Sequence, residues 1–308
     1  MFRVERIGDA PILVPHMDER MGANLAGPSL VRVPEWVPNA LGRYYLYFAH
    51  HNGEYIRLAY ADNIEGAWRI HTPGSLQHAE SHFPSDIGTP PPNRVLAPGA
   101  VISTPHIASP DVHIDDARRE FRMYYHGIIK HGEQRTRVAT SKDGLRFTAF
   151  EPILGTSYWR DFEHGGWHYG LTMPGIFQRS RDPLGPFEVG PTLFASNMRH
   201  SAVLVEGDTL TVLYTDVGEE PPEKILATTI DLRGDWMAWR TTEVVTVLEP
   251  ERDYEGADLP LVTSIRGEIS TRARQLRDPA LYLEGGRLYL LYAVAGESGI
   301  ALAELHRG

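Results

Sequence analysis

Short runs of hydrophobic and polar residues, separated by tight turns, recur along the chain. The segment RHSAVLVEGDTLTVLYTDVGE, which starts at Arg199, aligns without gaps with RDPALYLEGGRLYLLYAVAGE, which starts at Arg277. Each copy has two β-rich runs around a Glu-Gly turn, which is the pattern of a β-hairpin. The same plan recurs from Gly27 and from Ser109. The pattern therefore predicts repeated hairpins and no helix of usable length.

A further β-rich segment follows each hairpin: IRLAYADNIEGAW, TRVATSKDGLRF, ILATTIDLRGDWMAW and, last, GIALAEL. A fifth such segment, PGIFQRSRDPLGPFE, follows SYWRDFEHGGWHYGLT and marks a more divergent unit. Units that recur every few tens of residues and bury their faces against one another are typical of a β-propeller. Five units in 308 residues correspond to about 60 residues each.

We therefore predict an all-β fold, a five-bladed β-propeller with four-stranded antiparallel blades around a central pocket, formed as a single domain by residues 1–308. The segment FRVERI is expected to supply the outermost strand of the last blade and so to close the ring. The stretch FPSDIGTPPPNRVLAPG is expected to be a loop between blades. A two-domain sandwich is the alternative, but it leaves the repeat unexplained.

Composition excludes several classes of partner. A formal net charge of −10 opposes a nucleic-acid surface, because phosphate binding needs clustered Lys and Arg. No run of about 18 apolar residues is present to span a membrane. The segment MFRVERIGDAPILVPHMDER lacks the apolar stretch of a signal peptide, so we expect a cytoplasmic protein. With no cysteine, His and carboxylates are the only strong metal ligands. Nothing in the sequence predicts an oligomeric state.

Polar residues gather where the innermost strands of a propeller would begin. All innermost strands start at the same face of the central channel, so residues at these positions converge there. Read from the repeat, they are Asn24, Gly27, His106, Ser109, Asp111, Tyr158, Arg160, Arg199, His200, Arg277 and Asp278; the ends of the second strands add His50, His51, His126 and Asp216. Each one alone could be a turn or strand-end residue with structural hydrogen bonds. Several Arg and Asp together indicate a binding site, because a buried charge is costly unless it is paired.

Aromatic residues are the candidates for stacking on a sugar. An aromatic face covers the apolar C–H patches of a sugar ring, while Arg and His bind its hydroxyls. The candidates are Trp36, Trp159, Trp167 and Tyr169, whereas Trp68, Trp236 and Trp239 are expected to pack between strands.

Three segments carry a resemblance to a known family: SPDV at Ser109, RSRDPLGPFE at Arg179, and RDPALYLEGGRLYLLYAVAGESGIALA at Arg277. With its blade plan, the chain resembles the five-bladed propeller glycoside hydrolases, in particular families 43, 32 and 117. The resemblance to family 43 implies an inverting glycosidase, in which one carboxyl protonates the leaving oxygen and another activates water. The sequence departs from that family at matching positions, which hold Gly27 and the segments SYWRDF and Arg199-His200-Ser201.

Three carboxylates are predicted as the acid and base groups of a hydrolase: Asp111, Asp278 and Glu255. Glu255 comes from the long segment ERDYEGADLPLVTSIRGE, which also offers Asp258 and Glu268; a loop of this length often has a function. The expected partner is an oligosaccharide or polysaccharide. The predicted substrate-binding residues are Asn24, His50, His51, His106, His126, Tyr158, Trp159, Arg160, Tyr169, Arg199, His200, Asp216 and Arg277.

Two other functions stay open. A hydrolase of this kind requires no cofactor, but His50, His106, His126 and His200 are candidates for holding a divalent cation in the central channel, as in a metal-dependent polysaccharide lyase. The third hypothesis is a sugar-binding propeller without catalysis, which the missing family carboxylates favour.

Overall fold

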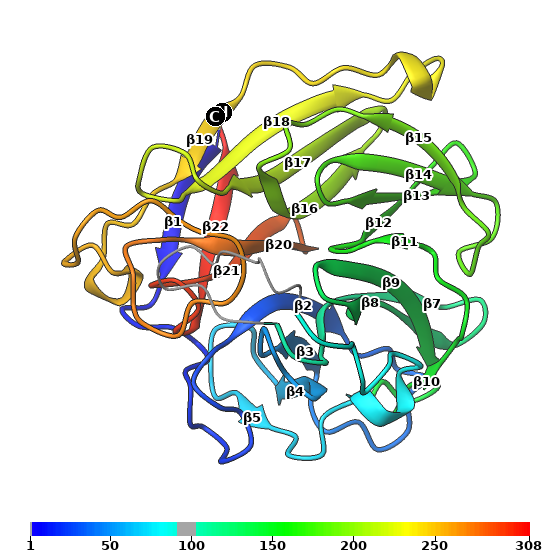
Figure 1. Cartoon of the computed structure of the whole chain (residues 1–308), viewed down its shortest axis with the longest axis horizontal. Coiled ribbons are helices and arrows are strands. Elements are labelled where there is room, and N and C mark those ends of the chain that lie inside the picture. Colours follow the sequence, from blue (N-terminus) through cyan, green and yellow to red (C-terminus); the bar gives the residue numbers. More distant parts are fainter. Residues whose placement is uncertain (1, 91–102) are drawn as a thin grey trace.

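The computed structural model describes residues 2–90 and 103–308, so the part of the predicted inter-blade loop beyond residue 90 lies outside them. Five antiparallel sheets surround one axis, which passes through the middle of the view in Figure 1. Three sheets have four strands, and the other two carry an additional short strand. The predicted five-bladed β-propeller is confirmed. Within the described ranges the helices are short 3₁₀ turns. None of them is long and apolar enough to cross a membrane.

The chain visits the blades in order and runs outward from the axis within the first four. The first blade contains β2 (Ala26–Arg32), β3 (Tyr44–Ala49), β4 (Tyr55–Ala61), β5 (Arg69–Ile70) and β6 (Leu76–Gln77), and the second contains β7 (Ile107–Asp115), β8 (Glu120–Lys130), β9 (Glu133–Ser141), β10 (Thr148–Ala149) and β11 (Gly155–Thr156). The third contains β12 (Arg160–His164), β13 (Trp167–Thr172), β14 (Ile176–Ser180) and β15 (Glu188–Thr192), and the fourth β16 (Met198–Glu206), β17 (Thr209–Asp216), β18 (Ile225–Asp231) and β19 (Val245–Leu248). The 3₁₀ turns are η1 (His78–Glu80), η2 (Trp236–Ala238) and η3 (Asp253–Glu255).

The fifth blade joins the two ends of the chain. Its inner strands are β20 (Arg277–Glu284), β21 (Arg287–Ala293) and β22 (Ile300–Arg307), and β1 (Phe2–Ile7) is its outermost strand. β1 pairs antiparallel with β22, from Phe2 opposite Arg307 to Ile7 opposite Leu302. The N and C marks lie together in Figure 1. The prediction that FRVERI closes the ring is confirmed.

The second strands of the blades form much of the core. Every residue of β3, with the sequence YYLYFA, is buried, because both faces of an inner strand contact neighbouring blades. These strands therefore read as continuous apolar runs rather than alternating ones. Tyr47 and Phe121 belong to the cluster that joins the first two blades. Trp68, Trp236 and Trp239 are buried, as predicted for packing residues.

A residue with positive φ stands near the start of every innermost strand. Gly27, Ser109, Tyr158, His200 and Asp278 have φ of 60°, 48°, 58°, 52° and 47°, in the left-handed region. In β2, β7, β16 and β20 the pairing register shifts beside this residue, which marks a β-bulge. Left-handed conformations at residues other than glycine cost free energy and cluster at functional sites. We call these five left-handed residues, four of which stand at a β-bulge, the bulge positions, and we infer that they mark the functional end of the channel.

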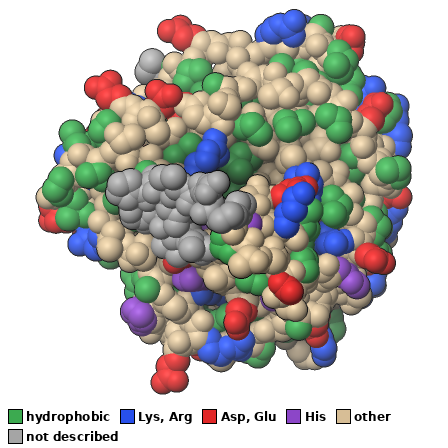
Figure 2. All heavy atoms as spheres, in the orientation of Figure 1, with side chains coloured by type: hydrophobic (Ala, Val, Ile, Leu, Met, Phe, Trp, Pro, Cys, Tyr) green, Lys and Arg blue, Asp and Glu red, His purple; other side chains and the backbone are tan. Residues whose placement is uncertain are grey.

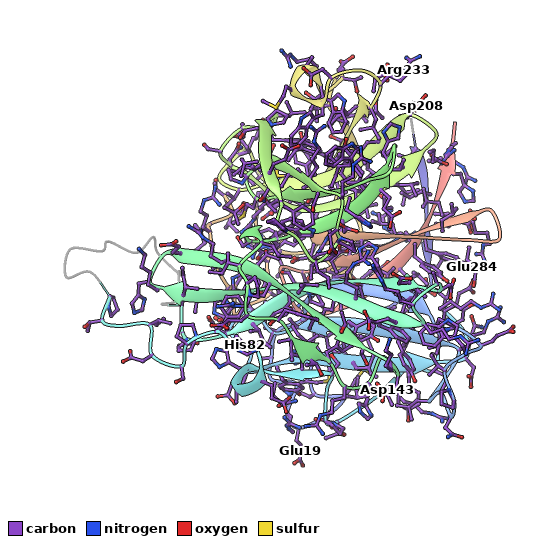
Figure 3. All side chains as sticks on the ribbon, turned by 90° about the vertical axis from the view of Figure 1, so that its right-hand side faces the viewer. Glu19, His82, Asp143, Asp208, Arg233 and Glu284 are labelled. Carbon is purple, nitrogen blue, oxygen red and sulfur yellow. The ribbon has the colours of Figure 1, made fainter. Side chains whose placement is uncertain are left out.

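The direction of the innermost strands defines two ends of the channel. We call the end at which these strands begin the mouth, and the end at which they turn back the lower end. Asp208 and Glu284, at the turns that follow β16 and β20, lie on one side of the molecule in Figure 3, and His82 lies toward the other.

Candidate functional site

The mouth collects side chains from all five blades. Figure 2, viewed as in Figure 1, shows a hollow near the middle of the face. Its described residues include a ring of contacts: His51 to His106 (ring centroids 6.3 Å apart), His106 to His126 (6.0 Å), His126 to Tyr158 (4.6 Å), Tyr158 to His200 (5.0 Å) and His200 Nδ1 to Asp278 Oδ2 (3.9 Å). The structure thus brings together six of the predicted site residues.

Asp278 is the only carboxyl at a bulge position. Its side chain is 1% exposed, and neither of its oxygens has a hydrogen-bond partner among the described residues. Burial, together with repulsion from Glu297, raises the pKa of Asp278 to about 7. Burial, with Arg199 and Arg277 nearby, holds the pKa of His200 well below its usual value. At neutral pH the contact between His200 and Asp278 therefore joins a neutral imidazole to a carboxyl that is partly protonated.

Two buried arginines are held by two glutamates. Arg199 binds Glu223 through two hydrogen bonds, Nε to Oε1 at 3.0 Å and Nη2 to Oε2 at 2.5 Å. Arg277 Nη1 donates to Glu297 Oε1 at 2.8 Å, and Arg277 Nε lies 3.4 Å from Glu223 Oε2. Such paired charges are costly to separate once buried, so they fix the positions of the side chains around Asp278.

Glu297 contacts three of the predicted residues. Besides Arg277, it accepts a hydrogen bond from Asn24 Nδ2 and lies 3.4 Å from His51 Nδ1. Burial opposes ionisation of Glu297, but His51 and Arg277 outweigh it and lower its pKa to about 2. Glu297 raises the pKa of His51 in turn, against the effect of burial. This carboxylate is therefore ionised beside the partly protonated Asp278.

Sequence reasoning missed Glu223 and Glu297 as site residues. Both lie shortly before the third strand of their blade, β18 or β22. An acidic residue at this place in both of the last two blades is the signal that could have identified them.

The long loop before β20 lies over the paired arginines. Arg199 Nη1 donates to the carbonyl of Ile265 at 3.2 Å, and Arg277 Nη1 to that of Gly267 at 3.4 Å. Glu268 lies 3.5 Å from His50 Nε2. Arg266, also missed, donates to the carbonyl of Ser196. The loop predicted to be functional thus contributes to the mouth.

Glu255 is placed elsewhere, and its prediction as an acid or base group is corrected. It is fully buried, and its Oε1 accepts hydrogen bonds from Arg6 Nε at 2.8 Å and from Tyr292 Oη at 2.9 Å. Its Oε2 accepts from the backbone N–H of Glu251 at 2.8 Å and of Arg252 at 3.0 Å. Glu255 therefore links β1 to β21 within the last blade and has no oxygen free for a substrate.

Trp159 and Tyr169 are not available to stack on a sugar. Trp159 is 1% exposed and stacks on Tyr124, with ring centroids 5.4 Å apart. Tyr169 stacks on Phe162 at 5.1 Å and packs among tryptophans of the fourth blade. Both rings fill the spaces between strands and blades, so this part of the prediction is corrected. Trp36 donates to Asp116 in the turn after β7, away from the mouth.

Asp111 and Arg160 lie further down the channel than predicted. Asp111 Oδ2 accepts hydrogen bonds from His113 Nε2 at 2.8 Å and from the backbone of Asp161 at 2.7 Å. Arg160 Nε donates to the carbonyl of Ser201 at 2.8 Å. Both residues line a cavity formed beyond the bulge positions, so Asp111 does not join Asp278 in one carboxyl pair.

Asp216 opens to a side pocket. This pocket, about 290 Å³ in volume, is also lined by Glu219, Glu220, Lys224 and Ser264. Burial and the two neighbouring acids Glu219 and Glu223 raise the pKa of Asp216 to about 6.

The four histidines that are candidates for holding a cation are not grouped as a metal site. Across residues 2–90 and 103–308, no three His, Asp or Glu side chains are arranged to hold a metal ion. His50 faces Glu268, whereas His106 Nδ1 lies 2.6 Å from the carbonyl of Thr104. His126 and His200 pack on either side of Tyr158. The geometry therefore gives no support to the lyase hypothesis.

Comparisons of the sequence with known proteins identify a viral relative. No family model matches the chain. It is similar to the uncharacterised protein R118 of Acanthamoeba polyphaga mimivirus, with 33% identity over 92% of this chain and 83% of that protein.

Among solved structures, an α-L-arabinofuranosidase from Lactobacillus brevis matches with a TM-score of 0.59 at 11% identity, covering 96% of this chain and 93% of that one. A family 43 β-xylosidase/α-arabinofuranosidase from a compost metagenome, in complex with xylotriose, matches with a TM-score of 0.60 at 12% identity, covering 100% and 96%. At such identities the likeness concerns the fold, and it confirms the resemblance seen in the sequence at that level. The chain belongs to the same family as mimivirus R118 and has the five-bladed propeller fold of the family 43 glycoside hydrolases.

Proposed function

We propose that this protein is a glycoside hydrolase that binds an oligosaccharide at the mouth and uses Asp278 for proton transfer. The observation that carries the proposal is the placement of Asp278: a buried carboxyl at a strained bulge position, at the end of the ring of side chains, with both oxygens lacking a partner among the described residues. A buried polar group without a partner is costly. A sugar hydroxyl or a glycosidic oxygen would supply the missing hydrogen bond.

The proposed chemistry divides the acid and base roles between Asp278 and Glu297. Two carboxyls whose surroundings push their pKa values apart are suited to opposite roles. Asp278, with a pKa of about 7, donates a proton to the leaving oxygen. Glu297, with a pKa of about 2, stays ionised and accepts the proton of the attacking water. The water oxygen bonds to the anomeric carbon as the glycosidic bond breaks, and the leaving oxygen takes the proton of Asp278. The scheme uses no cofactor.

The remaining mouth residues bind the sugar in this proposal. Asn24, His51, His126 and Tyr158 supply hydrogen-bonding groups and ring faces around Asp278. The structural neighbours named as arabinofuranosidase and xylosidase support a pentose-containing oligosaccharide as the substrate.

The test is hydrolysis of aryl α-L-arabinofuranoside, aryl β-D-xyloside, arabino-oligosaccharides and xylo-oligosaccharides by the whole protein. We expect turnover by the wild type and a loss of about 10²- to 10⁴-fold in kcat/KM for Asp278→Asn, the range for removing a general acid. Asp258→Asn is the matched control, because this loop carboxylate is half exposed. Equal rates for Asp278→Asn and the wild type would refute the assignment.

A sugar-binding protein without catalysis is the second candidate. It is favoured by the bulge positions, of which four hold Gly27, Ser109, Tyr158 and His200 rather than a carboxylate. Calorimetric titration with the same oligosaccharides separates the two functions. Binding by the wild type with no hydrolysis of any substrate would establish this second function instead.

A further inference from the structure

A second cavity lies in the channel below the bulge positions. It has a volume of about 200 Å³ and is lined by residues of all five innermost strands, among them Ser29, Asp111, Arg160, Ala202 and Tyr282. These residues follow the bulge positions along their strands, toward the end marked by Asp208 and Glu284 in Figure 3. We call it the lower cavity.

Two contacts between strands stand at the level between the lower cavity and the mouth. Arg160 reaches from β12 to the strands on either side, donating to the carbonyls of Ser201 at 2.8 Å and Pro110 at 3.4 Å. Gly27 lies so close to Ser109 that a Cβ at residue 27 would be 2.8 Å from the Ser109 Cα. The side chains that line the lower cavity are thus a different set from those around Asp278.

Two residues that line the lower cavity, Arg160 and Asp161, each carry a buried polar atom without a partner among the described residues. Asp161, which lines it and is 4% exposed, has no partner for Oδ1 among the described residues. Arg160 Nη2, on a second lining residue, also lacks a partner among the described residues. Asp161 Oδ2 has only long contacts, 3.4 Å to Arg122 Nη2 and 3.7 Å to His168 Nδ1. Native proteins leave few such atoms unsatisfied, so a cluster of them indicates a ligand or bound solvent.

The chemistry of the free atoms defines the ligand. Arg160 Nη2 is a donor, and Asp161 Oδ1 is an acceptor. A hydroxyl group both donates and accepts, so a molecule with several hydroxyls satisfies both kinds of atom. Asp111 and His113, which pair with each other at 2.8 Å, add a further acceptor and donor to the wall.

The volume of the lower cavity and the apolar part of its wall restrict the class of ligand further. Leu30, Val112, Leu281 and Tyr282 present apolar surface to the cavity, which suits the C–H face of a sugar ring. A volume of 200 Å³ corresponds to roughly six or seven waters at about 30 Å³ each. This space accommodates one sugar ring but not an oligosaccharide.

We propose that the lower cavity binds one monosaccharide-sized polyol, separately from the mouth. Asp161 accepts a hydrogen bond from a hydroxyl of the ligand, and Arg160 donates to another. The assignment is independent of the proposed hydrolase activity, because it uses neither Asp278 nor Glu297.

The test is calorimetric titration of the whole protein with D-xylose and with L-arabinose, followed by crystallography at saturating sugar. Asp161→Asn removes the charge of the acceptor at nearly constant shape. Leu283→Trp fills the rim of the cavity from a side chain that is 49% exposed, so it tests the site without a change in the buried polar cluster. Asp278→Asn is the control for binding at the mouth, and thermal unfolding verifies that each variant is folded.

We expect one binding event that weakens at least tenfold in both Asp161→Asn and Leu283→Trp and is unchanged in Asp278→Asn, with sugar density in the lower cavity. Binding that is lost only in Asp278→Asn would overturn the proposal, as would a crystal at saturating sugar that shows only ordered water in the lower cavity.

Discussion

The unfolding free energy of Asp278→Asn, relative to that of the wild type, should be higher at pH 8 than at pH 5. The pKa of Asp278 is raised from its ordinary value of 3.8 to about 7 in the folded protein. Between these two values the folded chain holds a proton that the unfolded chain has released. The stability of the wild type therefore falls as the pH rises through this window, and the full cost is present above pH 7.

The size of the effect follows from the difference between the two pKa values. The pKa of Asp278 differs by about three between the folded and unfolded chain, and each pH unit corresponds to about 1.36 kcal/mol. Ionisation of the buried carboxyl therefore lowers the unfolding free energy by about 4 kcal/mol. Asn has nearly the same shape and carries no charge at any pH, so the variant avoids this cost. Its unpaired amide lowers the unfolding free energy by about 1–3 kcal/mol at every pH. This constant loss does not change how the difference between variant and wild type depends on pH.

Urea unfolding at pH 5, 6, 7 and 8 measures the difference in unfolding free energy between Asp278→Asn and the wild type. We expect it to rise in favour of the variant across this range, while Asp258→Asn follows the wild type. A difference that stays flat from pH 5 to 8 would show that Asp278 is already ionised at pH 5, and it would remove this residue as the proton donor. In the same range, glycosidase activity should fall above about pH 7, because the donor loses its proton.

Two further variants test how the propeller is held together. Gly27→Ala should lower the free energy of unfolding in urea by about 2–4 kcal/mol, because Ala is strained at a left-handed φ and its Cβ would overlap Ser109. The control Gly207→Ala, at a φ of 58° with open space around it, should lower it by only about 1 kcal/mol. Equal losses in the two variants would contradict the close contact between Gly27 and Ser109. Glu255→Gln should lower the unfolding free energy by about 3 kcal/mol, because it breaks a buried pair with Arg6. The affinity for sugars, measured by calorimetry, should stay as in the wild type. A change in this affinity would show that Glu255 takes part in sugar binding.

The fold could be read from the sequence because the repeat is written in its strands. The hairpins from Arg199 and Arg277 share one template, and the buried second strands appear as apolar runs such as YYLYFA in β3. The closing strand FRVERI was also predictable, because the last blade lacked an outer strand. These features are local, so a single sequence displays them.

The site was predictable only up to the bulge positions. His200 and Asp278 align in the repeat, and the structure places both at the mouth. Asp111 lies two residues after Ser109, and the extra residue of the bulge changes the alternation of side chains beyond it. The carboxyl was therefore assigned to the wrong level of the channel.

Other errors came from contacts that sequence spacing does not display. Glu255 is satisfied by Arg6, which lies 249 residues away in the chain. Trp159 has the composition of a sugar platform, but its ring is covered by Tyr124 of the neighbouring blade. Only the packing of blades against each other distinguishes a stacked core residue from an exposed one.

The pairing of β1 with β22 also constrains how the protein is made. The first strand has a single neighbour in its sheet, and that neighbour ends at residue 307. During synthesis the hydrogen-bonding edge of β1 therefore stays unpaired while the other blades form, because β22 is synthesised after nearly all of the other strands. An unpaired strand edge favours association with other chains, so the newly made chain is most exposed to such association in the interval before the final blade is complete.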